Sequence, residues 1–124
     1  MRLLIDTHTF IWWVSEASSL GQQVRTAIND TTNEILISVA SLWELTIKRS
    51  NGKLRFGADL ETSVGEEGFR ILPITYRHLG VLETLPRLHR DPFDRMLIAQ
   101  AVADDLTLAT RDARLGAYGV SILW

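Results

Sequence analysis

The chain has 124 residues, of which 46% are hydrophobic and 23% charged. This length and balance suit a single domain over residues 1–124 with its own core, and they exclude a disordered or low-complexity chain. Thirteen Lys and Arg side chains face 15 Asp and Glu side chains, so the net charge of −2 shows none of the basic excess that marks many nucleic-acid binders.

The sequence contains no cysteine, which excludes disulfides and thiolate metal sites and fits a cytoplasmic protein. The apolar run near the start of the sequence ends at Asp6 after three residues. That run is too short for the core of a signal peptide, and no stretch approaches about 18 apolar residues. We therefore expect neither secretion by this route nor contact with a membrane.

Five short apolar stretches are typical of strands that are buried on both faces. In chain order they are residues 3–5, 34–38, 69–72, 106–109 and 120–123. Stretches with apolar residues at a spacing near 3.6, which indicates helix, lie between them at residues 20–28, 43–47 and 93–102. The alternation predicts a three-layer α/β/α fold with a mostly parallel, five-stranded sheet, and functional residues at the carboxyl ends of its strands.

Three helix starts are predicted from capping patterns. The spacing of a capping box begins at Ser19 and again at Ser41, and Asp91 precedes a proline that suits the first turn of a helix. Between Gly52 and Gly68 the sequence indicates turns and predicts no helix boundary.

Four carboxylates follow predicted strands or begin predicted helices, at the edge of the sheet where the strands end. They are Asp6, Glu44, Asp94 and Asp112. Four like charges in one crevice repel and raise one another's pKa, so their assembly requires neutralising cations. Oxygen ligands suit Mg²⁺ or Mn²⁺, and one or two such ions support hydrolysis of a phosphodiester.

Each acidic residue also has a possible structural role. Asp94 and Glu44 could each complete a capping box, and Asp112 could cap a short final helix. Asp91 is explained by its position before a proline, with support of the acidic site as the second possibility. Asp6 follows a buried strand and shows no capping pattern of its own, which favours a functional role.

Four segments carry a resemblance to a known family. They are residues 4–8, 38–45, 89–101 and 110–112, and the most specific block is Asp91-Pro92-Phe93-Asp94-Arg95. Together they resemble PIN domains and, more narrowly, the VapC toxins of bacterial type II toxin–antitoxin systems. The resemblance runs along the whole chain in the expected order.

The resemblance implies an endoribonuclease that depends on Mg²⁺ or Mn²⁺, with the four carboxylates named above as its catalytic and metal-binding residues. It also implies a VapB-type antitoxin as partner and a homodimer as the unit of assembly. Ser38 and Thr110 match small polar positions beside the acidic residues, and we expect them to supply supporting hydrogen bonds.

Four arginines lie near the acidic residues in sequence: Arg90, Arg95, Arg111 and Arg114. Guanidinium groups suit bidentate contact with phosphate, so these side chains could guide RNA to the crevice. Alternatively, Arg95 and Arg111 could pair with neighbouring aspartates and hold the site together. His89 is interpreted as a turn residue or a neighbour of the site, and Trp43 as part of the core.

Two other classes of function remain open at this point. A non-catalytic interaction module would use the acids only as helix caps, although a binding protein gains nothing from crowding four carboxylates. A phosphatase or phosphoacceptor of similar architecture is disfavoured, because His8 stands where one such family requires a second aspartate.

Overall fold

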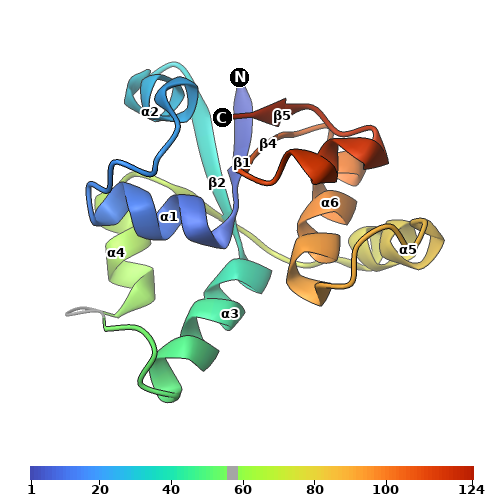
Figure 1. Ribbon diagram of the computed structural model, residues 1–124, viewed down its shortest axis with the longest axis horizontal. Coiled ribbons are helices and arrows are strands. Elements are labelled where there is room, and N and C mark those ends of the chain that lie inside the picture. The colour runs from blue at the N-terminus through green and yellow to red at the C-terminus, as the bar shows by residue number, and fades with distance from the viewer. Residues whose placement is uncertain (56–58) are drawn as a thin grey trace.

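The computed structural model describes residues 1–55 and 59–124, and it confirms the predicted α/β fold (Figure 1). Five strands form one sheet in the order β3-β2-β1-β4-β5, and every pair of neighbouring strands is parallel. The strands are β1 (Arg2–Ile5), β2 (Glu34–Ser38), β3 (Arg70–Leu72), β4 (Thr107–Ala109) and β5 (Ile122–Leu123). All five lie within or next to the stretches that the sequence predicts.

Helices connect the strands and cover both faces of the sheet (Figure 1). They are α1 (Thr7–Val14), α2 (Gln22–Asn29), α3 (Val39–Ser50), α4 (Leu60–Glu66), α5 (Tyr76–Thr84), α6 (Pro92–Asp104) and the 3₁₀ helix η1 (Ala113–Tyr118). Helix α4 lies in the segment for which the sequence predicts no helix boundary, and residues 56–58 of that segment are outside the described residues. Within the described ranges, no helix has the length and apolar character required to cross a membrane.

The sheet separates two apolar cores. In β1, Leu3 and Ile5 belong to one core, which includes side chains of α1, α2 and α4, whereas Leu4 belongs to the other, which includes side chains of α6 and η1. This alternation follows from the period of two along a strand. The apolar run of β1 is therefore buried on both sides, as its composition predicts.

The order of the strands creates a switch point at the centre of the sheet. From β1 the chain moves outward to β2 and β3, and it then returns to the opposite side of β1 to form β4 and β5. The Asp6 N–H donates to the Ala109 carbonyl oxygen at 3.1 Å, which continues the pairing to the carboxyl ends of β1 and β4. Crevices that bind ligands form at such points in open parallel sheets.

The structure corrects two of the predicted helix starts. Ser38 caps α3 by accepting a hydrogen bond from the Ala40 N–H at 3.0 Å, so the predicted capping box at Ser41 is wrong. The reason is that β2 leads directly into α3, and the last residue of the strand becomes the cap. The box at Ser19 is also wrong, since Gly21 occupies the capping position of α2 without a side-chain bond.

Trp43 does not belong to the core, contrary to the interpretation from its sequence. It is 60% exposed, and its ring packs edge-on against Phe93 of α6 with centroids 5.1 Å apart. Val39 and Ile47, one turn before and one turn after Trp43, are also exposed. Helix α3 thus presents an apolar stripe of Val39, Trp43 and Ile47 to the surface.

Gly21 provides a test of how the end of the sheet packs on α2. A Cβ atom at this position would lie 2.6 Å from the main-chain carbonyl carbon of Trp124 and 2.8 Å from its indole ring. Because the backbone would have to shift, we expect Gly21→Ala to lower the free energy of unfolding by about 1–3 kcal/mol in urea titrations.

The matched control is Gly80→Ala in α5, where a Cβ would meet no atom within 4 Å. Alanine favours helix over glycine, so this variant should be neutral or more stable by up to about 1 kcal/mol. Equal stability of the Gly21 variant and the unaltered protein would contradict the close packing of Trp124 on α2.

Candidate metal centre

Asp6 joins the end of β1 to the start of α1. Its Oδ1 atom accepts hydrogen bonds from the Thr9 N–H at 2.9 Å and the Thr9 hydroxyl at 2.6 Å, and Asp6 is only 8% exposed. The expectation that Asp6 shows no capping pattern is therefore wrong, because Asp6 and Thr9 have the spacing of a helix cap. Both bonds use Oδ1, and among the described residues Oδ2 accepts no hydrogen bond.

Glu44 lies in the second turn of α3 and reaches across to α1. Its Oε1 accepts a hydrogen bond from the Thr7 hydroxyl at 2.6 Å, and its Oε2 lies 3.6 Å from the Lys48 ammonium one turn further along α3. These contacts replace the predicted return bond to the backbone at Ser41. The carboxylate of Glu44 consequently lies beside the residue that follows Asp6.

The side chain of Asp94, in the first turn of α6, does not cap the helix. Asp91 caps the helix as predicted, since its Oδ1 accepts from the Phe93 N–H at 2.8 Å and the Asp94 N–H at 3.1 Å. In a capping box, Asp94 would accept from the Asp91 N–H, but that N–H donates to Nδ1 of His89 at 3.1 Å. The capping-box alternative for Asp94 is therefore wrong.

Asp94 is partly buried, and the charges of three other carboxylates act on it. Burial, followed by the charges of Asp91, Asp6 and Glu44, raises the pKa of Asp94 to about 6, and His89 opposes this rise. Like charges and burial both disfavour the ionised form of a carboxyl group. Asp6 and Glu44 are therefore near enough for their charges to act on Asp94.

Asp112 follows β4 and caps η1. The possible structural role given to it from the sequence, as the cap of a short final helix, is confirmed. Its carboxylate accepts hydrogen bonds from the Arg114 N–H, from Arg114 Nε at 2.8 Å and from Nη2 at 2.7 Å. The bond to the Arg114 side chain is the main cause that lowers the pKa of Asp112 to about 2. The expectation that all four acids raise one another's pKa is therefore wrong for Asp112, because Arg114 neutralises it. The Asp112 N–H also donates to the buried Thr110 hydroxyl at 3.1 Å.

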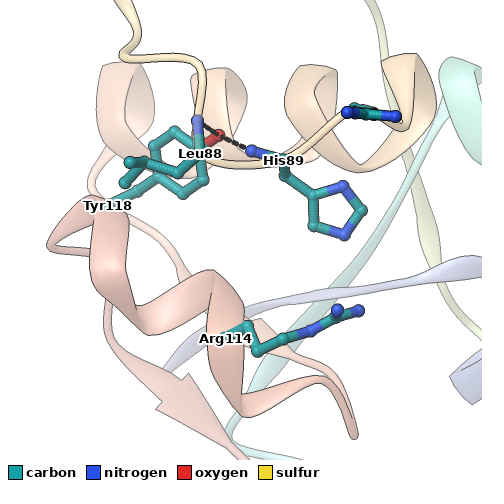
Figure 2. A pocket seen from close by; sticks show the side chains of 5 residues that line it. Leu88, His89, Arg114 and Tyr118 are labelled. Carbon is teal, nitrogen blue, oxygen red and sulfur yellow. Dashed lines mark hydrogen bonds between the residues drawn. The ribbon is translucent and has the colours of Figure 1, made fainter.

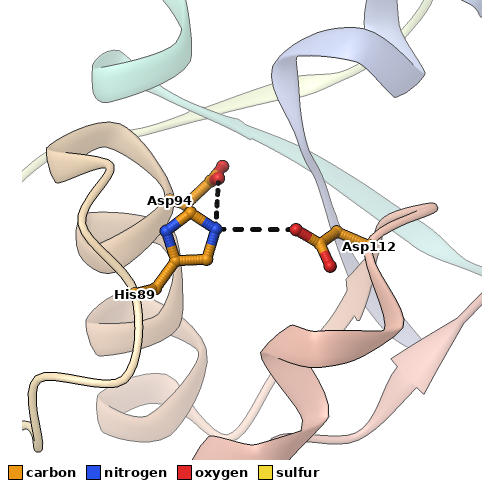
Figure 3. A group of neighbouring side chains, drawn as sticks. All are labelled: His89, Asp94 and Asp112. Carbon is orange, nitrogen blue, oxygen red and sulfur yellow. Dashed lines mark ion pairs between the residues drawn. The ribbon is translucent and has the colours of Figure 1, made fainter.

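His89 lies between two carboxylates from different elements, Asp94 of α6 and Asp112, which follows β4. Its Nε2 atom is 3.4 Å from Oδ2 of Asp94 and 3.5 Å from Oδ2 of Asp112. Figure 3 shows the imidazole with Nε2 directed between the two acids. Nε2 is buried and has no hydrogen-bond partner at normal distance among the described residues.

The donor set fits a hard divalent cation. One ligand atom each from His89, Asp94 and Asp112 lie within 4.8 Å of one another, and the charges of Asp6 and Glu44 act on Asp94 from neighbouring elements. Mg²⁺ and Mn²⁺ prefer the carboxylate oxygens of this group, and a bound cation would offset the burial and the acidic charges that raise the pKa of Asp94.

Among the described residues, Arg95 and Arg111 form no ion pair with a neighbouring aspartate, which was the alternative to contact with RNA. Arg95 donates to the Pro86 carbonyl oxygen at 2.9 Å and to the Tyr118 hydroxyl at 3.3 Å, so it fixes the loop before α6. The Arg111 guanidinium lies over the ring of Trp12, 5.9 Å from the centroid. Arg114 forms the pair with an aspartate instead.

Arg90 is exposed and lies beside two hollows that flank His89. One hollow of about 270 Å³ also includes Leu88, Arg114 and Tyr118 (Figure 2), and the other, of about 400 Å³, includes Arg87 and Arg95. Basic side chains therefore surround His89 on the surface next to the acidic residues.

Sequence reasoning missed several residues that hold the carboxylates. Thr7 and Thr9 bind Glu44 and Asp6, and Lys48 pairs with Glu44. The four-residue spacing of Glu44 and Lys48 is a recognisable helical ion-pair signal. Tyr118 had no such signal, because its contacts with the loop at 88–89 span about thirty residues of sequence.

The sequence was also compared with known protein families and proteins. The model of the PIN domain family matches residues 3–120, so the chain belongs to the PIN domain family. Ribonuclease VapC22 from Mycobacterium tuberculosis is 25% identical over 119 residues, which cover 94% of this chain and 91% of that protein.

Solved structures agree with this fold. VapBC2 from Rickettsia felis, bound to a promoter DNA fragment, has a chain with a TM-score of 0.71 and 14% identity, covering 99% of this chain and 98% of that chain. DNA-bound VapBC from Salmonella typhimurium gives 0.70 and 20% identity, with 99% and 97% covered.

The raised pKa of Asp94 predicts an unusual dependence of folding stability on pH. Its raised pKa means that between about pH 4 and pH 6 the folded protein keeps a proton that the unfolded chain releases, so stability falls as pH rises through this window. The side chain is 29% exposed, which reduces the effect. In EDTA, we expect Asp94→Asn to raise the free energy of unfolding by about 1–2 kcal/mol at pH 7.5 and by little at pH 4.

Urea unfolding at the two pH values measures this difference. Glu61→Gln removes an exposed carboxylate from the first turn of α4 and serves as the control, with changes within about 0.5 kcal/mol at both pH values. A stabilisation by Asp94→Asn that is equal at both pH values, or larger at pH 4, would contradict the crowding of charge around Asp94.

Proposed function

We propose that residues 1–124 form a single-domain, metal-dependent endoribonuclease of the VapC type, the toxin of a toxin–antitoxin pair. Its proposed partners are RNA, a VapB-type antitoxin and a second copy of the chain, and its proposed location is the cytoplasm. The observation that carries this proposal is the position of Asp94 at the switch point of the sheet, where the charges of Asp6 and Glu44 act on it and His89 Nε2 lies near both Asp94 and Asp112. A set of helix caps alone has no need to crowd Asp94 with other carboxylates, which disfavours a purely structural role.

The four acids would hold one or two ions of Mg²⁺ or Mn²⁺. The chemistry that such an ion supplies when bound is activation of water for attack on phosphorus and neutralisation of charge on the phosphate. The chain itself fixes the directions of the carboxylates. Thr9 holds Oδ1 of Asp6, Thr7 holds Oε1 of Glu44, and Arg114 holds Asp112 through its guanidinium.

The substrate would approach over the basic surface beside His89. We assign phosphate contact first to Arg90, which is exposed and lies beside both hollows. Arg114 and Arg111 keep exposed positions near Asp112 and are further candidates, whereas Arg95 fixes the loop before α6. Single-stranded or looped RNA fits such an open surface better than a regular duplex.

The comparisons support the proposed partners. Similar chains of this fold occur in VapBC complexes from Rickettsia felis and Salmonella typhimurium. The exposed stripe of Val39, Trp43 and Ile47 on α3 also supports association with another protein surface, since contiguous apolar side chains at the surface commonly mark interfaces.

Cleavage of labelled single-stranded RNA by the purified protein in Mn²⁺ or Mg²⁺ tests the proposal. We expect cleavage that EDTA abolishes, and a loss of at least about 100-fold in rate for Asp6→Asn, because a neutral amide is a far weaker ligand for a hard cation. Glu61→Gln, the exposed control in α4, should cleave like the unaltered protein. Undiminished cleavage by Asp6→Asn would contradict the proposal.

The same assay distinguishes the roles of the arginines and of the partner. Arg90→Ala should raise KM for RNA more than it lowers kcat, whereas Arg70→Ala, at the amino end of β3 on the opposite edge of the sheet, should change neither. In cells, growth arrest should be relieved by Asp6→Asn and by a VapB-type antitoxin. Sequencing of RNA ends after brief expression, with Asp94→Ala as the inactive control, would identify the RNA that is cut.

A further inference from the structure

The loop that carries His89 is attached to the same element that Asp112 caps. The Tyr118 hydroxyl, at the end of η1, accepts hydrogen bonds from the Leu88 N–H at 3.1 Å and the His89 N–H at 2.8 Å (Figure 2). Arg95 donates to the same hydroxyl. The backbone of His89 is therefore fixed relative to η1, although it lies almost thirty residues away in sequence.

The imidazole of His89 is fixed by a second contact. Its Nδ1 atom accepts the Asp91 N–H at 3.1 Å, and a ring nitrogen that accepts a hydrogen bond carries no proton. The proton of the neutral ring is consequently on Nε2, which is the atom directed between Asp94 and Asp112 (Figure 3). Nε2 thus offers a donor to two carboxylates from different elements.

A hydrogen-bond donor between Asp94 and Asp112 would link two carboxylates that the fold otherwise holds separately. Asp94 is on α6 and Asp112 caps η1, and the two helices belong to separate crossovers of the sheet. The distances of 3.4 and 3.5 Å from Nε2 are long for a hydrogen bond, so a shift of a few tenths of an ångström brings either oxygen into normal range. No other donor among the described residues contacts both carboxylates.

We infer that His89 is a positioning residue of the acidic centre, which donates from Nε2 to Asp94 and Asp112 and keeps their carboxylates at the spacing of a shared divalent ion. Tyr118 and the Asp91 N–H aim the ring for this purpose. The inference rests on the metal-dependent function proposed above. It assigns His89 to the support of the metal ligands and leaves the ligands themselves as carboxylates.

The competing arrangement has His89 as a direct ligand through Nε2. That arrangement requires the ring proton to move to Nδ1, which can then no longer accept the Asp91 N–H. The N–H of the residue that caps α6 would lose its partner, at a cost in stability. The structure therefore favours the donor over the ligand.

Calorimetric titration with Mn²⁺ tests the inference in the full chain. His89→Ala should weaken Mn²⁺ binding about 10-fold or more, as is typical when a group that orients metal ligands is removed. His89→Gln keeps an N–H donor at similar reach and should stay within about 3-fold of the unaltered protein. Tyr118→Phe should fall between the two, and His8→Ala, an exposed histidine of α1, should have no effect.

Two spectroscopic measurements distinguish a donor from a ligand. In protein labelled with ¹⁵N-histidine, NMR of the metal-free form should place the His89 proton on Nε2. Pulsed EPR of the Mn²⁺ form should then detect no nitrogen bonded to the metal. Circular dichroism and thermal melts of each variant show that a change in binding is not a loss of fold.

Unchanged Mn²⁺ affinity in His89→Ala, or a nitrogen bonded to Mn²⁺, would overturn the inference while leaving the proposed metal-dependent function intact. Failure of the unaltered protein to bind Mn²⁺ at all would instead contradict the proposed function, and the role of His89 with it.

Discussion

Electrostatic repulsion among carboxylates is the main constraint on the structure at the C-terminal ends of the strands. The topology places β1 and β4 side by side and so brings the residues that follow them together, and α3 and α6 add one acid each. The chain compensates part of the resulting charge. Arg114 pairs with Asp112 and Lys48 with Glu44, while Asp94 keeps a raised pKa because burial and its acidic neighbours act on it together.

The same residues that build the site also begin the helices around it. Asp6 caps α1 and Asp112 caps η1, and each uses part of its carboxylate for the backbone. This double use fixes the acids on rigid elements, which is the arrangement that a metal centre requires. With four of the 15 acidic residues gathered here, 13 basic side chains face 11 acidic ones over the rest of the chain. The net charge of −2 is therefore compatible with an RNA substrate, and recognition would depend on a few arginines and on the shape of the surface.

Sequence reasoning predicted the strands and the parallel sheet, because strand burial and the rule for crossovers are local or topological signals. It failed where two local patterns compete. Ser38 and Ser41 both suit a helix cap, and the abrupt passage from β2 into α3 selects Ser38. It also failed where tertiary context decides, as in the exposure of Trp43 and the attachment of Arg95 to the loop before α6.

The candidate site shows the same contrast between local signals, which the sequence carries, and tertiary contacts, which it does not. The positions of the four acids after strands and at helix starts make them candidates for the proposed site, but the residues that contact them were not predicted. The contact of Thr7 with Glu44 and those of His89 with Asp94 and Asp112 join separate elements, and a helical or strand period carries no information about them. The proposed role of His89 likewise depends on a tertiary contact, the hydrogen bond from the Asp91 N–H to its Nδ1.

The central claim is that four carboxylates form one metal centre at the switch point of the sheet. Anomalous scattering from crystals grown with Mn²⁺ tests it most directly. We predict a manganese peak within coordination distance of carboxylate oxygens of Asp6 and Asp94, with Glu44 and Asp112 on either side. Manganese bound elsewhere on the surface, with these carboxylates free of metal, would contradict it.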